Sequence, residues 1–522
     1  MRQVQTLPAL LGPVSEWMET IDVDGNFYWA NSKTGEAIWN EPPEHLDFLS
    51  ELDALAQLAD VLGEDWEHVD PDVANDIATA FGHIPRGNRR AFERLLPVLA
   101  SISKSPKLAE KLALNPAMAN LGAVMAANPD QTAILASAAS ALDAMLQHTA
   151  FKQQLDLFEY HVVLTNTTRQ HLATESLVCK CMSILSSLAF HNDTSAAYHM
   201  QLEIPRTIAS VIDMHASSCA ASGNFNCLLH CVTDMLYITA NHQNEFKQVV
   251  AQVAGPSIVT ALKTLKMLAK TAPGDNLKGH PVEDLVDRTS VPPHVDVVIQ
   301  LLANISLADD TVLPLLGLDV VGYTVRAMQA FPGEVPVLQH AIQFFANLGA
   351  AMTPEAHDEA VAYIIDHGAL KQMKIAMGDH DSQVELLSTT MDALLNICSN
   401  SEAAEEVVKL GIMDIVVDQL TRLDYERHLI LGILVLLETL TMHESSVHCA
   451  ARINLAQPLA LLADRYLDDI KMVVPCVTVF FNIAADAANR KNIIVSNGIP
   501  LLLRMLELYM DHDFTAKAMV ST

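Results

Sequence analysis

The sequence predicts a mainly α-helical protein, built as an array of repeated helical units, with a small three-stranded antiparallel β module at its N-terminus. Three observations support this fold class. Half of the 522 residues are hydrophobic but only 5% are aromatic, which favours helices packed through aliphatic side chains. Similar helical segments recur at a spacing near 43 residues in the second half. Three of the four Trp residues lie within the first forty positions, in strand-forming sequence.

Charge and cysteine content narrow the classes of function. A formal net charge of -30 argues against a nucleic-acid-binding surface or an anionic-membrane surface, since both require clustered Lys and Arg. Eight Cys with no regular spacing indicate reduced thiols. The sequence shows no signal peptide and no apolar run long enough for membrane insertion. We therefore expect a soluble, cytoplasmic protein.

The first 45 residues are predicted to form the β module. Strand-forming residues run from Trp17 to Ile21, from Phe27 to Asn31 and from Glu36 to Trp39. Asp24-Gly25 indicates the first hairpin turn, and Gly35 supplies a residue that adopts positive φ in the second. Three strands of this length bury little core, so the module depends on its aromatic side chains.

Alternation of side chains divides these aromatic residues between two faces. Tyr28 and Ala30 are expected on one face of the second strand and Trp29 on the other, while Ala37 and Trp39 share a face of the third strand. Two parallel aromatic rings on one face form a slot that grips a preformed polyproline II helix.

The stretch from Trp17 to Pro42 resembles a WW domain, because its two signature Trp residues are 22 positions apart and the closing Pro follows three positions later. The resemblance implies structural roles for Trp17, Trp29, Asn31 and Pro42, together with an upstream proline, Pro13 or Pro8. It also implies a groove for a proline-rich peptide, formed by Tyr28, Trp39, Ala30, Ser32 and Ala37.

The sequence departs from the WW pattern at the positions that read a ligand. Ser32 stands where one class carries a His, and Ala37 stands where the family usually has a groove Thr. Asp22 and Asp24 in the first loop would repel a phosphate group. The resemblance thus implies a proline slot of undefined specificity. The alternative is a degenerate module that packs against the helical body as a cap.

The remainder of the chain contains two columns of similar helices. One column carries Asn304, Asn347, Asn396 and Asn482, with Thr439 in the remaining position, at intervals of 43, 49, 43 and 43 residues. The second column begins at residues 367, 410, 453 and 497. Units of two or three helices with this period are typical of armadillo and HEAT arrays, and the segments from about 296 to 510 resemble armadillo repeats specifically.

The domain organisation that follows is a WW-like domain over 1–45 and an armadillo-like α-solenoid after it. Residues 46–180 are predicted to be helical with an uncertain repeat register, and residues 181–522 to be armadillo-type repeats. A segment at about 271–293 interrupts the array as a loop insertion.

The armadillo resemblance implies that the column of Asn residues lines a groove and holds the backbone of an extended peptide. An amide offers both a donor and an acceptor, so it pairs with any peptide unit. The alternative is that the same amides tie neighbouring repeats together. Nuclear-import members carry a Trp four residues before each Asn, whereas this chain has Gln300, Gln343, Asp392 and Thr478 there, which argues against that role.

Seven basic residues lie between 86 and 111 with only two acidic ones, and they either bind an acidic tail or phosphates or form a solvated helix face. They are Arg86, Arg89, Arg90, Arg94, Lys104, Lys107 and Lys111.

His443 and His448 are five residues apart, which places them on different faces of a helix and excludes a zinc-protease motif. Cys227 and Cys231 are interpreted as buried thiols. We expect no catalytic residues, no metal and no cofactor.

The sequence therefore predicts a non-enzymatic scaffold or adaptor. Its WW-like module would contact a proline-rich segment and its solenoid groove a second protein partner, for which a cytoskeletal or ciliary assembly is one setting. The alternative is a chaperone or trafficking cofactor whose solenoid clasps a folded client, with the WW-like module as a structural cap.

Overall fold

A computed structural model describes residues 14–21, 27–62, 66, 69–190, 192–222, 224–240, 244–267, 295–423 and 425–509. The chain divides into two compact units, Met1–Asn241 and His242–Thr522, each of which is described by itself. Several predictions lie outside the described residues. They concern Pro8, Pro13, Asp22, the Asp24-Gly25 turn and the loop at 271–293.

The first unit begins with the predicted antiparallel sheet, whose strands β1 (Trp17–Ile21), β2 (Phe27–Asn31) and β3 (Ala37–Ile38) pair in the order β1-β2-β3. Trp17 lies opposite Asn31 and Trp29 lies opposite Ile38. The turn between β2 and β3 uses Gly35 at a φ of 74°, as predicted. The Asn31 side-chain oxygen accepts from the backbone N–H groups of Lys33 and Thr34 in this turn, at 3.0 and 2.9 Å.

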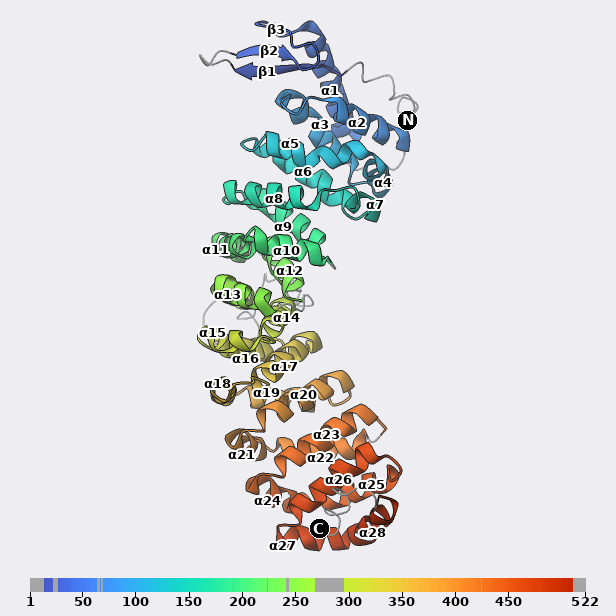
Figure 1. The fold of residues 1–522 in the computed structure, drawn as a ribbon, viewed down its shortest axis with the longest axis vertical. Helices are drawn as coiled ribbons and strands as arrows, with labels where there is room; N and C mark the ends of the chain where they lie inside the picture. The colour runs from blue at the N-terminus through green and yellow to red at the C-terminus, as the bar shows by residue number, and fades with distance from the viewer. Residues whose placement is uncertain are drawn as a thin grey trace, which may run out of the picture. The chain divides into compact units, whose positions relative to one another are not determined.

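The rest of the first unit is helical (Figure 1). Its elements are α1 (Pro43–Leu62), α2 (Pro71–His83), α3 (Arg89–Ile102), α4 (Pro106–Leu114), the 3-10 helix η2 (Pro116–Asn120), α5 (Leu121–Ala127), α6 (Thr132–Met145), α7 (Thr149–Lys152), α8 (Leu157–Gln170), α9 (Glu175–Ala189), α10 (Asp193–Gln201), α11 (Ile204–Ser222) and α12 (Asn226–Ala240). Helices α3, α6, α9 and α12 pack against one another in that order. Each therefore buries its apolar stripe against its neighbours along the array.

The second unit continues with helices in groups of three. Its elements are α13 (Asn244–Met267), α14 (Val295–Ile305), the 3-10 helix η4 (Asp309–Thr311), α15 (Val312–Leu316), α16 (Val320–Ala330), α17 (Val335–Gly349), α18 (Pro354–Asp366), α19 (Ala369–Asp379), α20 (Val384–Ile397), α21 (Ser401–Lys409), α22 (Ile412–Arg422), α23 (Arg427–Leu440), α24 (Glu444–Arg452), α25 (Ala456–Arg465), α26 (Ile470–Ile483), α27 (Ala487–Val495) and α28 (Gly498–Leu508). The third helices of successive repeats, α14, α17, α20, α23 and α26, pack against one another in order. They carry the predicted Asn column.

In each of the five repeats that follow α14, a residue with positive φ marks the junction between the first and second helices. These residues, with φ between 52° and 74°, are Asp319, Gly368, Gly411, Asn454 and Asn497. Gly adopts this left-handed conformation without strain, and Asn and Asp tolerate it better than other residues. The Gly and Asn residues that recur in the second column of the sequence repeat are therefore explained by this left-handed backbone conformation.

The core is aliphatic, as the composition predicts. Leu394 and Leu437 occupy the same position in successive third helices and are completely buried. Truncating such a residue to Ala typically costs about 2–5 kcal/mol. Among the described residues no single helix is long and apolar enough to cross a membrane. Of these residues, only α14 and η4–α15, counted together, reach that length and apolar composition, and the two segments are bent by 119° from one another.

Candidate functional site

One face of the sheet is packed against the first helices of its unit. Trp17 and Trp29 are buried, with 7% and 6% of their surface exposed. The Trp17 indole N–H donates to Glu44 Oε2 on α1 at 3.2 Å. The Trp29 ring lies 4.6 Å from the ring of His45, also on α1, measured between centroids. The two tryptophans predicted to hold the module together thus also hold it to the helices.

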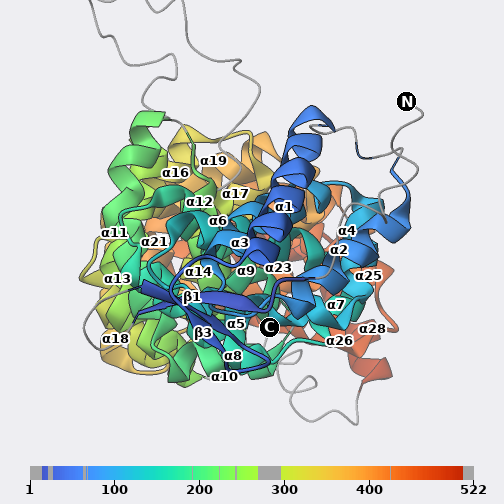
Figure 2. The same cartoon turned by 90° about the horizontal axis from the view of Figure 1, so that it is seen from above.

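Arg90 on α3 contacts both the sheet and the segment that leads into α1. Its guanidinium lies 5.5 Å from the centre of the Trp29 ring and donates to both carboxylate oxygens of Glu41 at 3.0 and 3.1 Å. A second carboxylate, that of Glu19 on β1, is 3.5 Å away. Asn88, just before α3, donates from its side chain to the Trp17 carbonyl at 3.2 Å. Figure 1 and Figure 2 both show the strands beside α1 and α3.

His45 is the buried titratable group of this junction. Its Nδ1 is 2.9 Å from the Ser15 hydroxyl, and no described group pairs with its Nε2 within hydrogen-bonding distance. Burial lowers the pKa of His45 to about 4, with Arg90 and Arg94 acting in the same direction against Glu41. The imidazole is therefore neutral at pH 7. Pro42, also buried, directly precedes α1.

The opposite face of the sheet presents the second aromatic pair. Trp39 is 68% exposed and Tyr28 is partly exposed, with their ring centroids 6.2 Å apart. The planes of the two rings meet at 66°, so the expectation of parallel walls is wrong for this structure. The angle arises because the rings meet edge to face, which the ring quadrupoles favour.

A hollow of about 370 Å³ lies at this pair, lined by Tyr28, Ala37, Ile38 and Trp39. Of the predicted groove residues, Ala30 pairs with Ala37 across the strands without lining the hollow. Ser32 is exposed outside it, and its hydroxyl donates to the Glu16 carbonyl at 3.0 Å. Ile38 was not predicted, because strand alternation assigns it to the other face.

The Asn column ties successive third helices together. The Asn347 amide donates to the Ala303 carbonyl at 2.7 Å, and the Asn396 amide donates to the Ala346 carbonyl at 3.0 Å. The Asn482 amide donates to the carbonyl of Glu438 at 3.3 Å and to the Thr441 hydroxyl at 3.1 Å. The side chain of Asn304, in the first position, forms no hydrogen bond with a described residue.

All four Asn side chains are half-buried and retain an edge at the surface. In Asn347 the amide oxygen accepts from Gln343 at 2.9 Å. The amide oxygens of Asn396 and Asn482 accept from no described group. The amide nitrogens of Asn347, Asn396 and Asn482 thus link neighbouring repeats, while the amide oxygens of Asn396 and Asn482 remain available as acceptors. A role of the Asn column in peptide binding stays a prediction.

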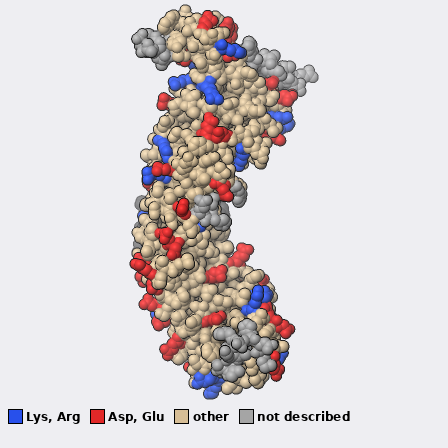
Figure 3. All heavy atoms as spheres, in the orientation of Figure 1, with Lys and Arg blue, Asp and Glu red and all other residues tan. Residues whose placement is uncertain are grey.

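The seven basic residues do not form one free cationic surface. Arg90 is engaged as described, and Arg94 donates to Asp53 on α1 at 2.6 Å. The others are exposed, on the loop before α3, at its start or around α4: Arg86, Arg89, Lys104, Lys107 and Lys111. On the face drawn in Figure 3, Lys and Arg occur in small groups among Asp and Glu.

The polar groups considered for chemistry are separated or buried. The eight Cys are free thiols, and Cys227 and Cys231 are buried. His443 lies 3.1 Å from the Cys398 carbonyl, whereas His448 lies between Glu444 and Asp486. Within the described parts of the chain, no group of three or more His, Cys, Asp and Glu is arranged to hold a metal ion.

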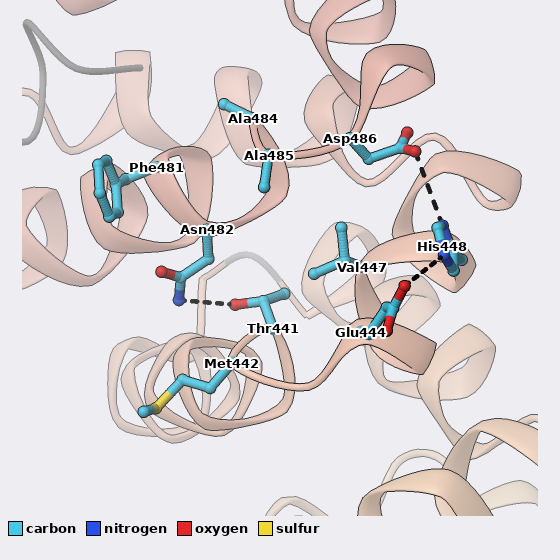
Figure 4. A pocket seen from close by; sticks show the side chains of 10 residues that line it. All are labelled: Thr441, Met442, Glu444, Val447, His448, Phe481, Asn482, Ala484, Ala485 and Asp486. Atoms are coloured by element: carbon cyan, nitrogen blue, oxygen red, sulfur yellow. Dashed lines mark hydrogen bonds and ion pairs between the residues drawn. The ribbon is translucent and has the colours of Figure 1, made fainter.

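A second hollow, which sequence reasoning missed, lies between the last two complete repeats (Figure 4). It measures about 590 Å³ and includes the exposed side chains of Met442 and Phe481 beside Asn482. We call it the Phe481 pocket, and its lining residues are Thr441, Met442, Glu444, Val447, His448, Phe481, Asn482, Ala484, Ala485 and Asp486. The feature of the sequence that could have indicated this pocket is Phe481, an aromatic residue directly before Asn482 of the Asn column.

No protein-family model matches the sequence, and a search of curated proteins finds no relative. Solved structures do match. A structure from a study of a phosphorylation switch that controls the interaction between cadherin and beta-catenin matches with a TM-score of 0.52 and 12% identity, over 92% of this chain and 96% of that one. A computationally designed armadillo repeat protein matches with a TM-score of 0.41 and 15% identity, over 54% of this chain and 99% of the design. At these identities the similarity concerns the fold: the chain is an armadillo-like α-solenoid with a small three-stranded sheet at its N-terminus.

Proposed function

We propose that this protein is a non-enzymatic adaptor of the cytoplasm that binds a proline-rich segment with its N-terminal sheet and a second protein with its solenoid. The observation that carries the proposal is the unequal burial of three tryptophans, two in the small sheet and one directly after its third strand. Trp17 and Trp29 are buried, whereas Trp39 leaves 68% of its surface exposed beside Tyr28. A large exposed aromatic side chain next to a hollow is typical of a binding surface.

The chemistry of the hollow suits proline. Its lining consists of two aromatic rings and two aliphatic side chains, and it contains no charged group. A proline ring packs on aromatic faces, and a polyproline II helix is ordered before it binds. Trp39 must turn from its edge-to-face contact with Tyr28 to form a slot with parallel walls. An exposed side chain makes such a rotation on the ps–ns timescale.

The solenoid provides the second contact, on the surface that carries the exposed acceptors of Asn396 and Asn482. Two weak sites on one chain raise the effective concentration for each other's ligand, so modest affinities give a stable assembly. A cytoskeletal or ciliary assembly, in which partners are repeated, is a setting that this arrangement suits.

The test uses a fluorescein-labelled decaproline peptide and fluorescence anisotropy with the full-length protein. We expect saturable binding that Trp39→Ala weakens by about tenfold or more, the loss typical of removing an aromatic anchor. Tyr425→Ala is the matched control, because Tyr425 is a 67% exposed aromatic residue of the second unit. The proposal fails if decaproline does not bind, or if Trp39→Ala and Tyr425→Ala bind it equally well.

A second candidate function is supported by the contacts of the buried face. Arg90, His45 and Asn88 hold the sheet on α1 and α3 as a cap would be held. In that case the solenoid clasps a folded client and the sheet only protects the first helices. A variant lacking residues 1–41 would then lose stability in urea while retaining its client, and decaproline would not bind the intact protein.

A further inference from the structure

The Phe481 pocket brings together side chains from two successive repeats. It lies where the third helices α23 and α26 end and the next first helices, α24 and α27, begin. Its volume of about 590 Å³ is within the range of sites that hold a few side chains. Figure 4 shows Phe481 and Met442 toward one end, Asn482 and Thr441 between, and Glu444, His448 and Asp486 toward the other.

The first end of the pocket is apolar and open to solvent. Met442 exposes 76% of its surface and Phe481 exposes 46%. One repeat earlier, the position of Phe481 is occupied by Glu438, so the aromatic ring is not a requirement of the repeat. Met is flexible and polarizable and adapts to the shape of an apolar ligand group. This end therefore suits an aliphatic side chain.

The other end carries two carboxylates with a single imidazole between them. His448 lies 3.6 Å from Glu444 Oε1 and 3.6 Å from Asp486 Oδ2. Asp486 is fixed, because it caps α27 by accepting from the N–H groups of Ala488 and Asn489 at 2.8 and 3.0 Å. These bonds lower the pKa of Asp486, chiefly the one from Asn489, so the group remains an anion.

The guanidinium of Arg490, on the helix that Asp486 caps, is already engaged. Arg490 donates to the carbonyls of Ala484 and Ala485, just after α26, at 2.7 and 3.0 Å, and its charge adds only a minor contribution to the lowered pKa of Asp486. The Glu444 side chain is 90% exposed, and among the described residues its one ion-pair partner is His448. An incoming cation would find one mobile and one fixed carboxylate.

Asn482 supplies the element between the two ends. Its amide nitrogen is committed to the Glu438 carbonyl and the Thr441 hydroxyl, whereas its oxygen accepts from no described group. An extended peptide crossing the pocket presents backbone N–H groups that this oxygen can accept. The lining thus alternates between apolar, hydrogen-bonding and anionic, in the order in which Figure 4 shows it.

We propose that the Phe481 pocket binds an extended peptide segment in which an aliphatic side chain occupies the Met442–Phe481 end and a nearby Lys or Arg pairs with Glu444 and Asp486. This inference rests on the proposed function and names the chemistry of the solenoid's second partner. Charge complementarity selects this occupant over an acidic peptide, and the strong negative charge of the whole chain favours a basic partner.

The probes are fluorescein-labelled Gly-Ser decapeptides that contain one Leu and one Arg separated by one, two or three residues. With the full-length protein, one spacing should bind best, and replacing its Arg with Asp should weaken binding about tenfold. Glu444→Lys should weaken binding about fivefold, the effect of reversing one exposed charge pair. Phe481→Ala should weaken it about tenfold.

Two controls match these variants. Glu402→Lys reverses an exposed carboxylate in the first turn of α21, and Met352→Ala removes an apolar side chain that is 88% exposed. Both should bind the peptide as the unaltered protein does. Because Glu444 is almost fully exposed, its variant tests the pocket even if Phe481→Ala unfolds.

The proposal is overturned if no Leu/Arg peptide binds at millimolar concentration, or if the pocket variants and their controls bind alike. It is also overturned if the Asp peptide binds more tightly than the Arg peptide. Concentration-dependent dimerisation that Phe481→Ala abolishes would assign the pocket to a second copy instead. Decaproline binding by the same preparations, and its loss in Trp39→Ala, reports separately on the proposed function.

Discussion

Lowering the pH should loosen the N-terminal sheet through His45. The folded pKa of this imidazole, about 4, lies below its ordinary value of 6.5, because burial disfavours the charged form. In the window between these two values the unfolded chain binds a proton and the folded chain does not. The contribution of His45 to stability is therefore complete above pH 6.5 and falls as the pH decreases toward 4.

The size of the effect follows from the same two values. One unit of pKa difference corresponds to about 1.4 kcal/mol, and pH 5.0 lies about one and a half units below the unfolded pKa. The free energy of unfolding should thus be about 2 kcal/mol smaller at pH 5.0 than at pH 7.5 on account of this residue. That amount is a substantial fraction of a domain's stability.

Urea titrations followed by tryptophan fluorescence measure this loss, because all four Trp residues lie between positions 17 and 66. His45→Asn keeps an amide near the Ser15 hydroxyl but cannot be protonated, and His83→Gln removes an exposed imidazole from α2 as the control. The unaltered protein and His83→Gln should lose about 2 kcal/mol more than His45→Asn between pH 7.5 and 5.0. Equal losses in all three proteins would refute the neutral, buried state of His45.

Three further substitutions test the ties described above. Arg90→Ala should destabilise the sheet by about 1–2 kcal/mol, seen in the same fluorescence titration, because it removes a cation–π contact and two ion pairs, whereas Arg89→Ala should not. Asn347→Ala should cost the second unit about 1 kcal/mol in a urea titration followed by circular dichroism, since it deletes an inter-repeat hydrogen bond; an equal cost for Asn304→Ala, which lacks such a bond, would contradict this. Gly411→Ala should lower the same stability by about 1 kcal/mol, because its φ of 71° strains any residue with a Cβ, and an unchanged urea midpoint would disprove that strain.

Sequence reasoning recovered the repeat of the second unit because the repeated residues have fixed roles in the backbone or in packing. Gly411 and Asn497 take the left-handed conformation, and Asn347 and Asn396 bond to the preceding repeat. Helices α3, α6 and α9 begin 43 residues apart as well. In that region no recurring residue type marks the junctions, and the left-handed position before α11 is held by Glu203, so the sequence does not display the period.

The strands were predictable from local alternation, but the contacts made by the side chains on the two faces of the sheet were only partly predictable. The contacts of Trp29 come from His45 and Arg90, which local sequence patterns do not connect to it. The angle between Tyr28 and Trp39 depends on side-chain rotamers, which alternation does not specify. The Phe481 pocket was missed for a related reason: α26 is apolar on nearly every side, so its periodicity does not show which residues remain exposed.

The left-handed residues at equivalent positions also mark where a whole repeat of the second unit could be removed. Excising residues 368–410 would join the end of α18 to Gly411. Gly411 has the same left-handed conformation as Gly368, and it precedes α22, which is the counterpart of the excised α19. Because each repeat packs mainly on its neighbours, the new contacts would resemble the old ones. We therefore expect that a 43-residue unit between Gly368 and Asn497 can be removed or duplicated while the two ends of the second unit keep their contacts.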